Sequence, residues 1–293
     1  MAWFLVANAA ANLEERRIAS GFGFLGREAG FEIGQSFFLR YGAADSYLRA
    51  LAVGLANTLT VSAIGIVLAT GMGFAVGLFC LSKNILLKNL AAAYVEFLRN
   101  VPLLVQLFFW YALIAESLPG PREALNPLPG VFLSNRGIFF PTLFSSPVLD
   151  GFNFSGGAAV TPEFAALLIG LATYTAAFID EIVRAGILAV PRGQHEAADA
   201  LGLNDFQKTF RIVLPQALRA IVPPLTSQYL NLTKNSSLAV AIGYPDLVSI
   251  ANTTINQTGQ AIEGVAIIMA VYLSISLAIS AFMNWYNARI ALR

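Results

Sequence analysis

Residues 50–82 read ALAVGLANTLTVSAIGIVLATGMGFAVGLFCLS, a run of 33 positions without a charged side chain. A transmembrane helix needs about 20 mostly apolar residues, because the hydrocarbon core is about 30 Å thick and each helical residue advances about 1.5 Å. The run is long enough for one complete crossing with residues to spare. It predicts a membrane-spanning helix and indicates an integral membrane protein.

The composition of the whole chain supports this interpretation. Of the 293 residues, 57% are hydrophobic and 12% are charged, whereas a soluble domain carries roughly 45–50% and 25%. The 18 basic and 17 acidic side chains leave a formal charge of +1, so no strong positive field exists to attract nucleic acid. The composition therefore argues against a soluble globular enzyme and against a nucleic-acid-binding protein.

Residues that usually carry catalytic or metal chemistry are scarce. The single cysteine is Cys80 and the single histidine is His195, which excludes an intramolecular disulfide and argues against a multi-ligand metal site. We expect His195 to be a surface residue or a subunit contact. The segment GFGFLG at residues 21–26 fits G-x-G-x-x-G, but no strand pattern precedes it, and the sequence contains no G-x-x-x-x-G-K-[ST] loop. We expect no catalytic residue, no metal and no nucleotide-binding site in this chain.

Four further segments are candidates for membrane spans. Residues 264–288 form a second charge-free run, and residues 100–115 and 164–179 form shorter runs of 16 residues each. Residues 216–242 include Lys234, which would cost roughly 2.5–3.5 kcal/mol at a lipid-facing helix centre and should therefore face protein or water. The sequence thus predicts an all-α polytopic bundle with five main spans.

One of these spans has an unusual start. Pro102 lies two residues into the run at 100–115. A proline inside a helix removes one backbone hydrogen bond and can introduce a kink. The sequence therefore predicts a kink at this point, which could be a hinge or a passive bend.

Basic residues indicate which loops are cytoplasmic. They occur after the first span, between the third and fourth spans and after the last span, and an alternating path places all three on one side. The segment rich in Pro, Gly, Ser and Asn after the second span indicates an ordered external loop or a short re-entrant element. The predicted parts are an N-terminal stub and external segment at 1–49, whose apolar residues 1–11 could end an additional span, a transmembrane domain at 50–293, an external insertion at about 116–163, and a cytoplasmic loop at about 184–215.

The cytoplasmic loop contains a helix-turn-helix pattern. Residues 194–201 are good helix formers, and Gly202 follows where a left-handed C-terminal cap is expected. Asn204 can cap a second helix, and Gln207, three positions later, can complete a capping box. We expect this helix to continue to about Pro215, where the chain re-enters the membrane. Taken alone, the pattern fits a docking surface or an ordinary polar connector.

The spacing in this loop resembles the EAA loop of the membrane subunits of ATP-binding-cassette (ABC) importers. Gly202 lies six residues after Glu196 of the Glu-Ala-Ala triplet, and an Ile-Val-Leu-Pro segment begins at Ile212, ten residues after the glycine. The resemblance implies that the first helix of the loop is a coupling helix, which sits in a groove of the ATP-hydrolysing subunit. The residues that it assigns to coupling are Arg192, Glu196, Ala197, Ala198, Asp199 and Gly202.

Further segments resemble the polar amino-acid permeases of the histidine and glutamine type. EFLRNVPLLVQL at 96–107 is similar to their first block, although Gly-Thr-Pro is more usual there than Asn-Val-Pro. Residues 174–194 resemble their second block, and KNSSL at 234–238 is similar to their Lys-x-Thr/Ser-Ser-Leu segment. Residues 21–31 and 132–138 look like the general L-amino-acid importer branch, whose members are often longer.

This resemblance implies the fold, the partners and the cofactors. The fold would be that of a type I ABC importer permease, a multi-pass protein of the bacterial inner membrane that carries L-amino acids. The expected partners are a homodimer of ATP-binding subunits, a second homologous permease subunit that makes a heterodimer, a periplasmic amino-acid-binding protein and membrane lipid. ATP and Mg²⁺ would be bound by the ATPase subunits, so this chain would hold no cofactor and would not itself be an enzyme.

Polar residues within the spans are candidates for a substrate path. Lys234, Ser236 and Ser237 lie within or just past the fourth span. Polar side chains there need partners, which neighbouring helices or a passing polar solute could supply. Structural hydrogen bonding and substrate contact fit these residues about equally well. Weaker candidates on the same argument are Gln106, Tyr174 and Asn231.

Two other functions compete with an ATP-driven importer. A secondary transporter driven by an ion gradient usually has two related halves and intramembrane acidic or histidine residues, and the charge-free spans and the absence of an internal repeat count against it. A membrane anchor or sensor would explain the hydrophobicity but not the pattern between Pro191 and Pro215. The importer is therefore the favoured prediction.

Overall fold

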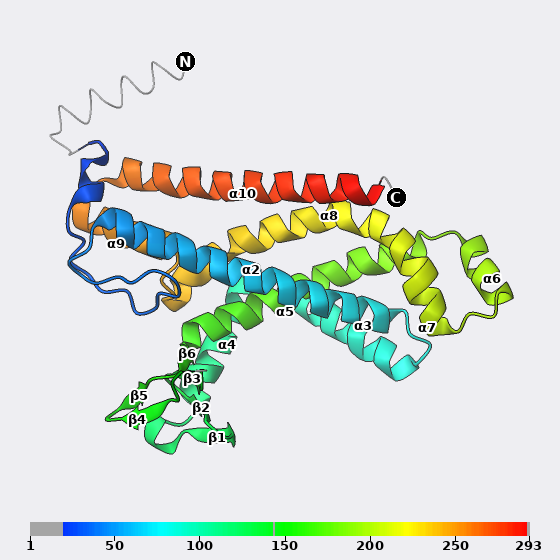
Figure 1. Ribbon diagram of the computed structural model, residues 1–293, viewed down its shortest axis with the longest axis horizontal. Coiled ribbons are helices and arrows are strands. Elements are labelled where there is room, and N and C mark those ends of the chain that lie inside the picture. Colours follow the sequence, from blue (N-terminus) through cyan, green and yellow to red (C-terminus); the bar gives the residue numbers. More distant parts are fainter. Residues whose placement is uncertain (1–19, 143, 292–293) are drawn as a thin grey trace, which may run out of the picture. The chain divides into compact units, whose positions relative to one another are not determined.

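The computed structural model describes residues 20–142 and 144–291, and its main elements are helices (Figure 1). Within these residues, three helices are long and apolar enough to cross a membrane: α2 (Tyr47–Cys80), α5 (Pro162–Leu188) and α10 (Ala261–Ala291). Two bent helix pairs also qualify, which gives up to five crossings if each pair is one span. This confirms the predicted polytopic helical bundle. The apolar residues 1–11, proposed as the end of an additional span, lie outside the described residues.

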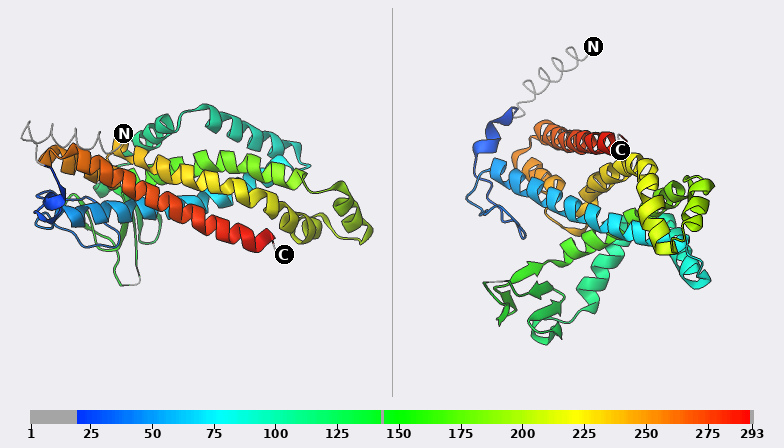
Figure 2. Two further views of the ribbon diagram at one scale, coloured as in Figure 1. Left: turned by 90° about the horizontal axis from the view of Figure 1, so that it is seen from above. Right: turned by 45° about the vertical axis from the view of Figure 1, so that its right-hand side comes forward.

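Each bent pair joins helical segments across a short break. Helices α3 (Ile85–Asn100) and α4 (Leu103–Ser117) meet at 105°, a bend that can be followed in Figure 2. A helical stretch from Asp205 to Ile242 and α9 (Leu247–Thr258) form the second pair. That stretch consists of α7 (Asp205–Gln207), the π-helix η3 (Lys208–Val213), α8 (Leu214–Asn235) and the 3-10 helix η4 (Ser236–Ile242). The other helical elements are the 3-10 helices η1 (Phe22–Gly26) and η2 (Pro121–Glu123) and helix α6 (Arg192–Ala200).

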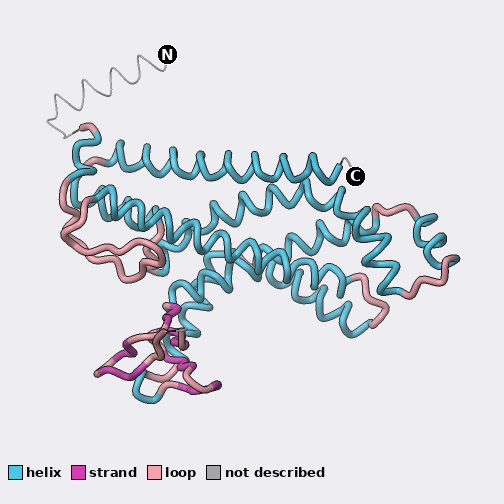
Figure 3. Tube along the Cα trace, in the orientation of Figure 1, coloured by secondary structure: helices cyan, strands magenta, loops and turns pink. Residues whose placement is uncertain are grey.

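The segment predicted as an ordered external loop or a short re-entrant element contains β-structure that the sequence did not indicate. Its described part folds into short strands, drawn in magenta in Figure 3. Strands β1, β2, β3 and β6 form an antiparallel sheet in that order, and β4 pairs with β5 as a hairpin. The strands are β1 (Leu125–Leu128), β2 (Val131–Ser134), β3 (Gly137–Phe140), β4 (Val148–Asp150), β5 (Asn153–Ser155) and β6 (Ala158–Val160).

Aromatic side chains join the sheet to the hairpin. The Phe154 ring stacks on Phe132, with ring centroids 4.6 Å apart, and lies 4.8 Å from the Phe139 ring. Phe139 is only 4% exposed, so these rings form a small hydrophobic core for the insertion. Strands of three or four residues are too short to show a clear alternation of apolar and polar positions. That is why the sequence alone indicates a loop.

The described chain forms two compact units, the first of residues up to 60 and 237–275 and the second of residues 61–236 and from 276 onward. In the first unit, hydrogen bonds attach the segment before α2 to the first turn of α10 and to the residue just before α10. The backbone N–H of Gly21 donates to Glu263 at 2.6 Å, and the Gln260 amide donates to the Gly21 carbonyl at 3.1 Å. The G-x-G-x-x-G segment at residues 21–26 is thus part of a packed 3-10 helix.

Helix α5 is the central helix of the second unit. It packs against α3, α4 and α8, and most of its apolar stretch is buried. Two glycines permit close approach: a Cβ atom at Gly170 would lie 2.5 Å from Leu107 of α4, and one at Gly186 would lie 2.4 Å from Ile221 of α8. The small residues of α5 therefore set how closely its neighbours approach.

Helix α2 also approaches α5 through glycines. Gly73 and Gly77 are spaced as in a GxxxG motif, whose small residues let two membrane helices pack closely. A Cβ atom at Gly73 would lie 2.6 Å from the Ile179 side chain, and one at Gly77 would lie 2.9 Å from Val183. No residue larger than glycine fits at these two positions without displacing α5.

The predicted kink at Pro102 is a complete break. Helix α3 ends at Asn100, and Pro102 is the N-cap of α4. The Gln106 amide nitrogen donates to the carbonyls of Leu98 and Val101 at 2.9 and 3.0 Å. Gln106 is 5% exposed, so it supplies the hydrogen bonds that water would otherwise give to the open end of α3.

Replacement of Gln106 by leucine should therefore destabilise the break. Two carbonyls would lose their donors, at a cost of about 1–3 kcal/mol for each buried unsatisfied group. The measurement is the thermal unfolding midpoint of the purified protein in detergent. Val105→Leu at the exposed neighbouring position is the control and should leave the midpoint unchanged. An equal midpoint for both variants would show that the amide does not stabilise the bend.

Candidate functional site: a coupling segment and a polar cavity

The structure confirms a helix at the start of the cytoplasmic loop. Helix α6 begins at Arg192, directly after Pro191, and ends at Ala200. Gly202 then has a φ of +71°, the left-handed conformation expected from its position. The N–H groups of Gly202 and Leu203 donate to the carbonyls of Asp199 and Ala198 at 3.0 and 3.1 Å. These bonds provide donors for carbonyl groups in the last turn of the helix, which have no partner within the helix.

The capping box at Asn204 is also present. The Gln207 N–H donates to the Asn204 side chain at 2.8 Å, and the Asn204 N–H donates to the Gln207 side chain at 3.3 Å. The second helix does not end near Pro215, as the sequence suggests, but continues through η3 into α8. A π-helical turn shifts the hydrogen-bond register just before the proline, whose missing N–H is tolerated near the start of a helical segment. The second helix of the segment that the resemblance assigns to coupling is therefore continuous with α8.

Ion pairs fix α6 on this continuous helix. The Lys208 ammonium lies 2.7 Å from Asp199 and 3.4 Å from Asp205, and the Lys83 ammonium lies 2.9 Å from Asp205. Exposed ion pairs of this kind contribute little to stability, because water screens them. Their effect is to orient α6, α7 and the start of α3 relative to one another.

The residues assigned to coupling do not share one environment. Glu196, Ala197 and Gly202 are exposed, whereas Ala198 is only 2% exposed. Arg192 is exposed and Asp199 is paired with Lys208. This segment also carries Leu201 and Phe206, which are large and exposed. Sequence reasoning missed these two, although both are apolar residues in a charged loop.

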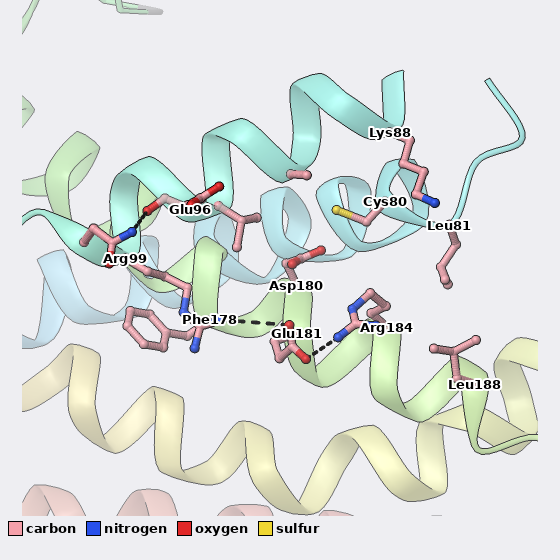
Figure 4. Close-up of a pocket in the computed structure, with 13 residues that line it drawn as sticks. Cys80, Leu81, Lys88, Glu96, Arg99, Phe178, Asp180, Glu181, Arg184 and Leu188 are labelled. Carbon is pink, nitrogen blue, oxygen red and sulfur yellow. Dashed lines mark hydrogen bonds and ion pairs between the residues drawn. The ribbon is translucent and has the colours of Figure 1, made fainter. Parts of the chain in front are cut away.

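A second feature is a cavity of about 770 Å³ between α2, α3 and α5, here called the polar cavity (Figure 4). Its walls carry equal numbers of acidic and basic side chains. The basic ones are Lys88, Arg99 and Arg184, and the acidic ones are Glu96, Asp180 and Glu181. Cys80, the single cysteine of the sequence, also lines it.

Glu181 is shared between two arginines in this cavity. It forms an ion pair with Arg184 and lies 3.8 Å from Arg99, as the dashed lines in Figure 4 show. The Arg99 guanidinium also lies 5.0 Å from the centre of the Phe178 ring. Both arginines and Glu181 are partly exposed to the cavity. Their charges are therefore available to a bound molecule.

Asp180 lies deeper in the same cavity. It is 2% exposed, and its Oδ1 atom has no hydrogen-bond partner among the described residues. A buried polar atom without a partner is costly. We therefore expect this oxygen to meet a hydrogen-bond donor from outside the chain, such as water or the ammonium group of a ligand.

The six residues predicted for the substrate path lie elsewhere. The amide of Gln106 serves the α3–α4 break, and the hydroxyl of Ser236 donates to the Thr233 carbonyl at 2.8 Å. The Tyr174 ring packs on Phe178, with centroids 5.0 Å apart. Asn231 and Lys234 are exposed on α8, and Ser237 is half-buried in η4. None of these six lines the described walls of the polar cavity.

Sequence reasoning used Arg99, Glu181 and Arg184 to identify a family but not as site residues, and it used Asp180 only as the end of a charge-free run. A usable signal was present, because ionisable residues inside a spanning helix are functional candidates. Helix α5 continues to Leu188, so Asp180 and Glu181 lie within it. Among the described residues, no group of three or more His, Cys, Asp or Glu side chains is arranged to hold a metal ion.

Comparison with known proteins identifies the family. Residues 65–292 match the binding-protein-dependent transport system inner membrane component family. The chain is 46% identical to the permease protein YhdX of Escherichia coli (strain K12), over 99% of this chain and 90% of that protein. It is 44% identical to the general L-amino acid transport system permease protein AapQ of Rhizobium johnstonii, over 99% of this chain and 88% of that protein.

A solved structure agrees with the sequence matches. The chain resembles the crystal structure of an amino acid ABC transporter with histidines, at 29% identity and a TM-score of 0.61, over 83% of this chain and 95% of that one. The chain is thus a multi-pass transport subunit with the fold of ABC importer permeases, and an ion-driven secondary transporter is not favoured. It belongs to the family of binding-protein-dependent transport system inner membrane components.

Proposed function

We propose that this chain carries L-amino acids across the bacterial inner membrane as one permease subunit of an ATP-driven importer. The observation that carries the proposed substrate is the polar cavity, in which Glu181 lies between Arg99 and Arg184 and near Asp180. An amino acid bears an ammonium and a carboxylate, and each needs an opposite charge or hydrogen bonds when it leaves water. A cavity with both kinds of group meets both needs.

The proposed partners supply the steps that this chain cannot perform. Two identical ATP-binding subunits would bind and hydrolyse ATP with Mg²⁺, and a periplasmic binding protein would deliver the amino acid. A second, homologous permease subunit would complete the transport path as a heterodimer. Relatives described as amino-acid permeases support this arrangement. The chain itself would remain a transport subunit without enzymatic activity.

Coupling would pass through α6. Closure of the ATP-binding subunits would move α6 by its exposed face, which includes Glu196 and Ala197. The buried Ala198 and the Lys208–Asp199 ion pair attach α6 to η3, which continues as α8. Movement of α6 would therefore reach a spanning helix directly and shift the balance between inward-facing and outward-facing states.

Cysteine crosslinking tests this coupling. A cysteine replaces Ala197, which is exposed, rather than the buried Ala198, in a Cys80→Ser background. We expect crosslinks to cysteines in a groove of the co-expressed ATP-binding subunit, with a yield that changes between ATP and no nucleotide. A cysteine at Ala159, exposed on β6 of the insertion, is the control and should not crosslink.

Two outcomes would contradict the proposal in different ways. An assembled complex in which Ala197→Cys forms no crosslink along the ATP-binding subunit would exclude α6 as the coupling helix. Uptake into proteoliposomes tests the transport itself, and we expect at least about tenfold more L-amino acid with ATP than with ADP. Uptake that follows an imposed ion gradient and ignores ATP would support the secondary transporter instead.

A further inference from the structure

A second cavity lies where the spanning helices meet the coupling segment, and no transport step described above uses it. It has a volume of about 830 Å³ and lies entirely within the second compact unit. Its walls come from the last turns of α2 and α5, the start of α3, and the segment from α6 to η3. We call it the loop-side cavity.

One wall of the loop-side cavity is apolar and exposed. Phe79 of α2 and Leu188 of α5 line it at the very ends of their spans, and Leu188 is 61% exposed. Phe206 and Phe210 continue this wall, with ring centroids 4.6 Å apart. A span ends near the boundary between the hydrocarbon core and the headgroups, so we expect these side chains to lie close to that boundary.

Basic side chains also line this cavity. Lys83 and Lys208 line the cavity, but their charges are already matched by Asp205 and Asp199. Arg192 and His195 also line it and have no hydrogen-bond or ion-pair partner in the described part of the chain.

These two residues lie three positions apart on α6 and therefore share one face of the helix. Among the lining residues and their ion-pair partners, Lys83, Lys208 and Arg192 carry three permanent positive charges. Asp199 and Asp205 carry two negative charges. One positive charge therefore remains to attract an anion.

We propose that the loop-side cavity binds one anionic phospholipid. The phosphodiester would accept hydrogen bonds from Arg192 and His195, and one acyl chain would lie along Phe79, Leu188 and Phe210. Basic side chains at the loop-side ends of spanning helices favour anionic headgroups over zwitterionic ones. This lipid would bridge α6 to the ends of α2 and α5, so the coupling segment would rest on the membrane surface as well as on protein.

Native mass spectrometry of the purified complex with its ATP-binding subunits tests this site. The complex is washed free of lipid and titrated with phosphatidylglycerol or with phosphatidylcholine of the same acyl chains. The test variant is Arg192→Gln with His195→Gln. The matched control is Arg211→Gln, because Arg211 is an exposed arginine of η3 that does not line the cavity.

We expect the wild type to retain one more phosphatidylglycerol per copy of this chain than the double variant. The apparent affinity should fall at least about tenfold in the double variant and stay unchanged in Arg211→Gln. Phosphatidylcholine should be retained no better by the wild type than by the double variant.

Equal retention of phosphatidylglycerol by the wild type and the double variant would overturn the proposal, as would equal retention of the two lipids by the wild type. Complete displacement by millimolar inorganic phosphate would indicate a free-phosphate site instead. If the permease without its ATP-binding subunits retains the additional phosphatidylglycerol and the complex does not, protein covers the cavity in the complex and the proposal is wrong.

The same spectra report whether the double variant assembles. If it does not, Leu188→Asn alters only the exposed apolar wall, and undiminished lipid retention by that variant would equally overturn the proposal. Lipid retention is measured without transport, so failure of this site and failure of the proposed transport function remain distinguishable.

Discussion

Replacing Gly73 with leucine should prevent α2 from packing on α5 and sharply lower the yield of folded protein. The Cβ atom alone would lie 2.6 Å from both the Cβ and the Cγ2 of Ile179 and 3.1 Å from the Ala176 carbonyl. Overpacking a core usually costs about 1–3 kcal/mol. Here the added atom meets the branched Ile179 side chain at its Cβ, which is bonded directly to the α5 backbone and cannot move by a rotamer change, so we expect the upper end of that range or more.

The matched control for this prediction is Gly71→Leu. Gly71 lies on the same helix two residues earlier and is exposed, and a Cβ atom added there would have no neighbour within 4 Å among the described residues. Both substitutions gain the same intrinsic helix preference, about 1 kcal/mol over glycine, so their difference isolates the contact with α5. The measurement is the monodisperse fraction and the unfolding midpoint in detergent. Equal behaviour of the two variants would show that α2 does not need this close approach.

The second large effect is expected in the polar cavity. Replacing Glu181 with glutamine removes the charge that Arg99 and Arg184 share and leaves three cations in the cavity opposed only by Glu96 and Asp180. Hydrogen bonds to charged groups contribute about 1.5–3 kcal/mol, so amino-acid uptake should fall by about one to two orders of magnitude. The control is Glu116→Gln, at an exposed position of α4 outside the cavity, and uptake should be retained.

Cys80 provides a readout of occupancy that does not depend on transport. It is the single cysteine in the sequence and lines the cavity, so a small methanethiosulfonate reagent should label it in the unmodified protein. L-amino acids should slow this labelling in the wild type but not in Glu181→Gln. If they slow it equally in both, Glu181 has a structural role and does not contact the substrate.

The spanning helices could be predicted because their signal is local. The length of a charge-free run such as residues 50–82 directly gives the approximate length of the spanning helix, and the same holds for the runs in α5 and α10. The coupling hairpin was equally predictable, since Gly202 and Asn204 act on their immediate neighbours. The break at Pro102 was foreseen only as a kink, because its completion depends on Gln106, whose amide reaches back to Leu98 across eight positions.

The polar cavity could not be assembled from the sequence in the same way. Arg99 and Glu181 belong to different helices and are 82 positions apart, so no local pattern shows that they meet. In the sequence, the polar residues that attract attention as substrate-path candidates are those surrounded by apolar ones, such as Gln106 and Ser236. In the structure, both side chains donate hydrogen bonds to backbone carbonyls close to them in the sequence. In the insertion, the rings of Phe132 and Phe154 likewise meet only after the chain has turned back.

The close contacts of α5 have a consequence for how such a chain changes over evolutionary time. Its residues face glycines of α2 at positions 73 and 77, and its own glycines face Leu107 of α4 and Ile221 of α8. A larger side chain on one side of any of these contacts requires a smaller one on the other. A substitution in α5 at one of these contacts therefore requires a compensating substitution in a neighbouring helix. Among related sequences, we expect paired exchanges at positions 73 and 179, 77 and 183, 107 and 170, and 186 and 221.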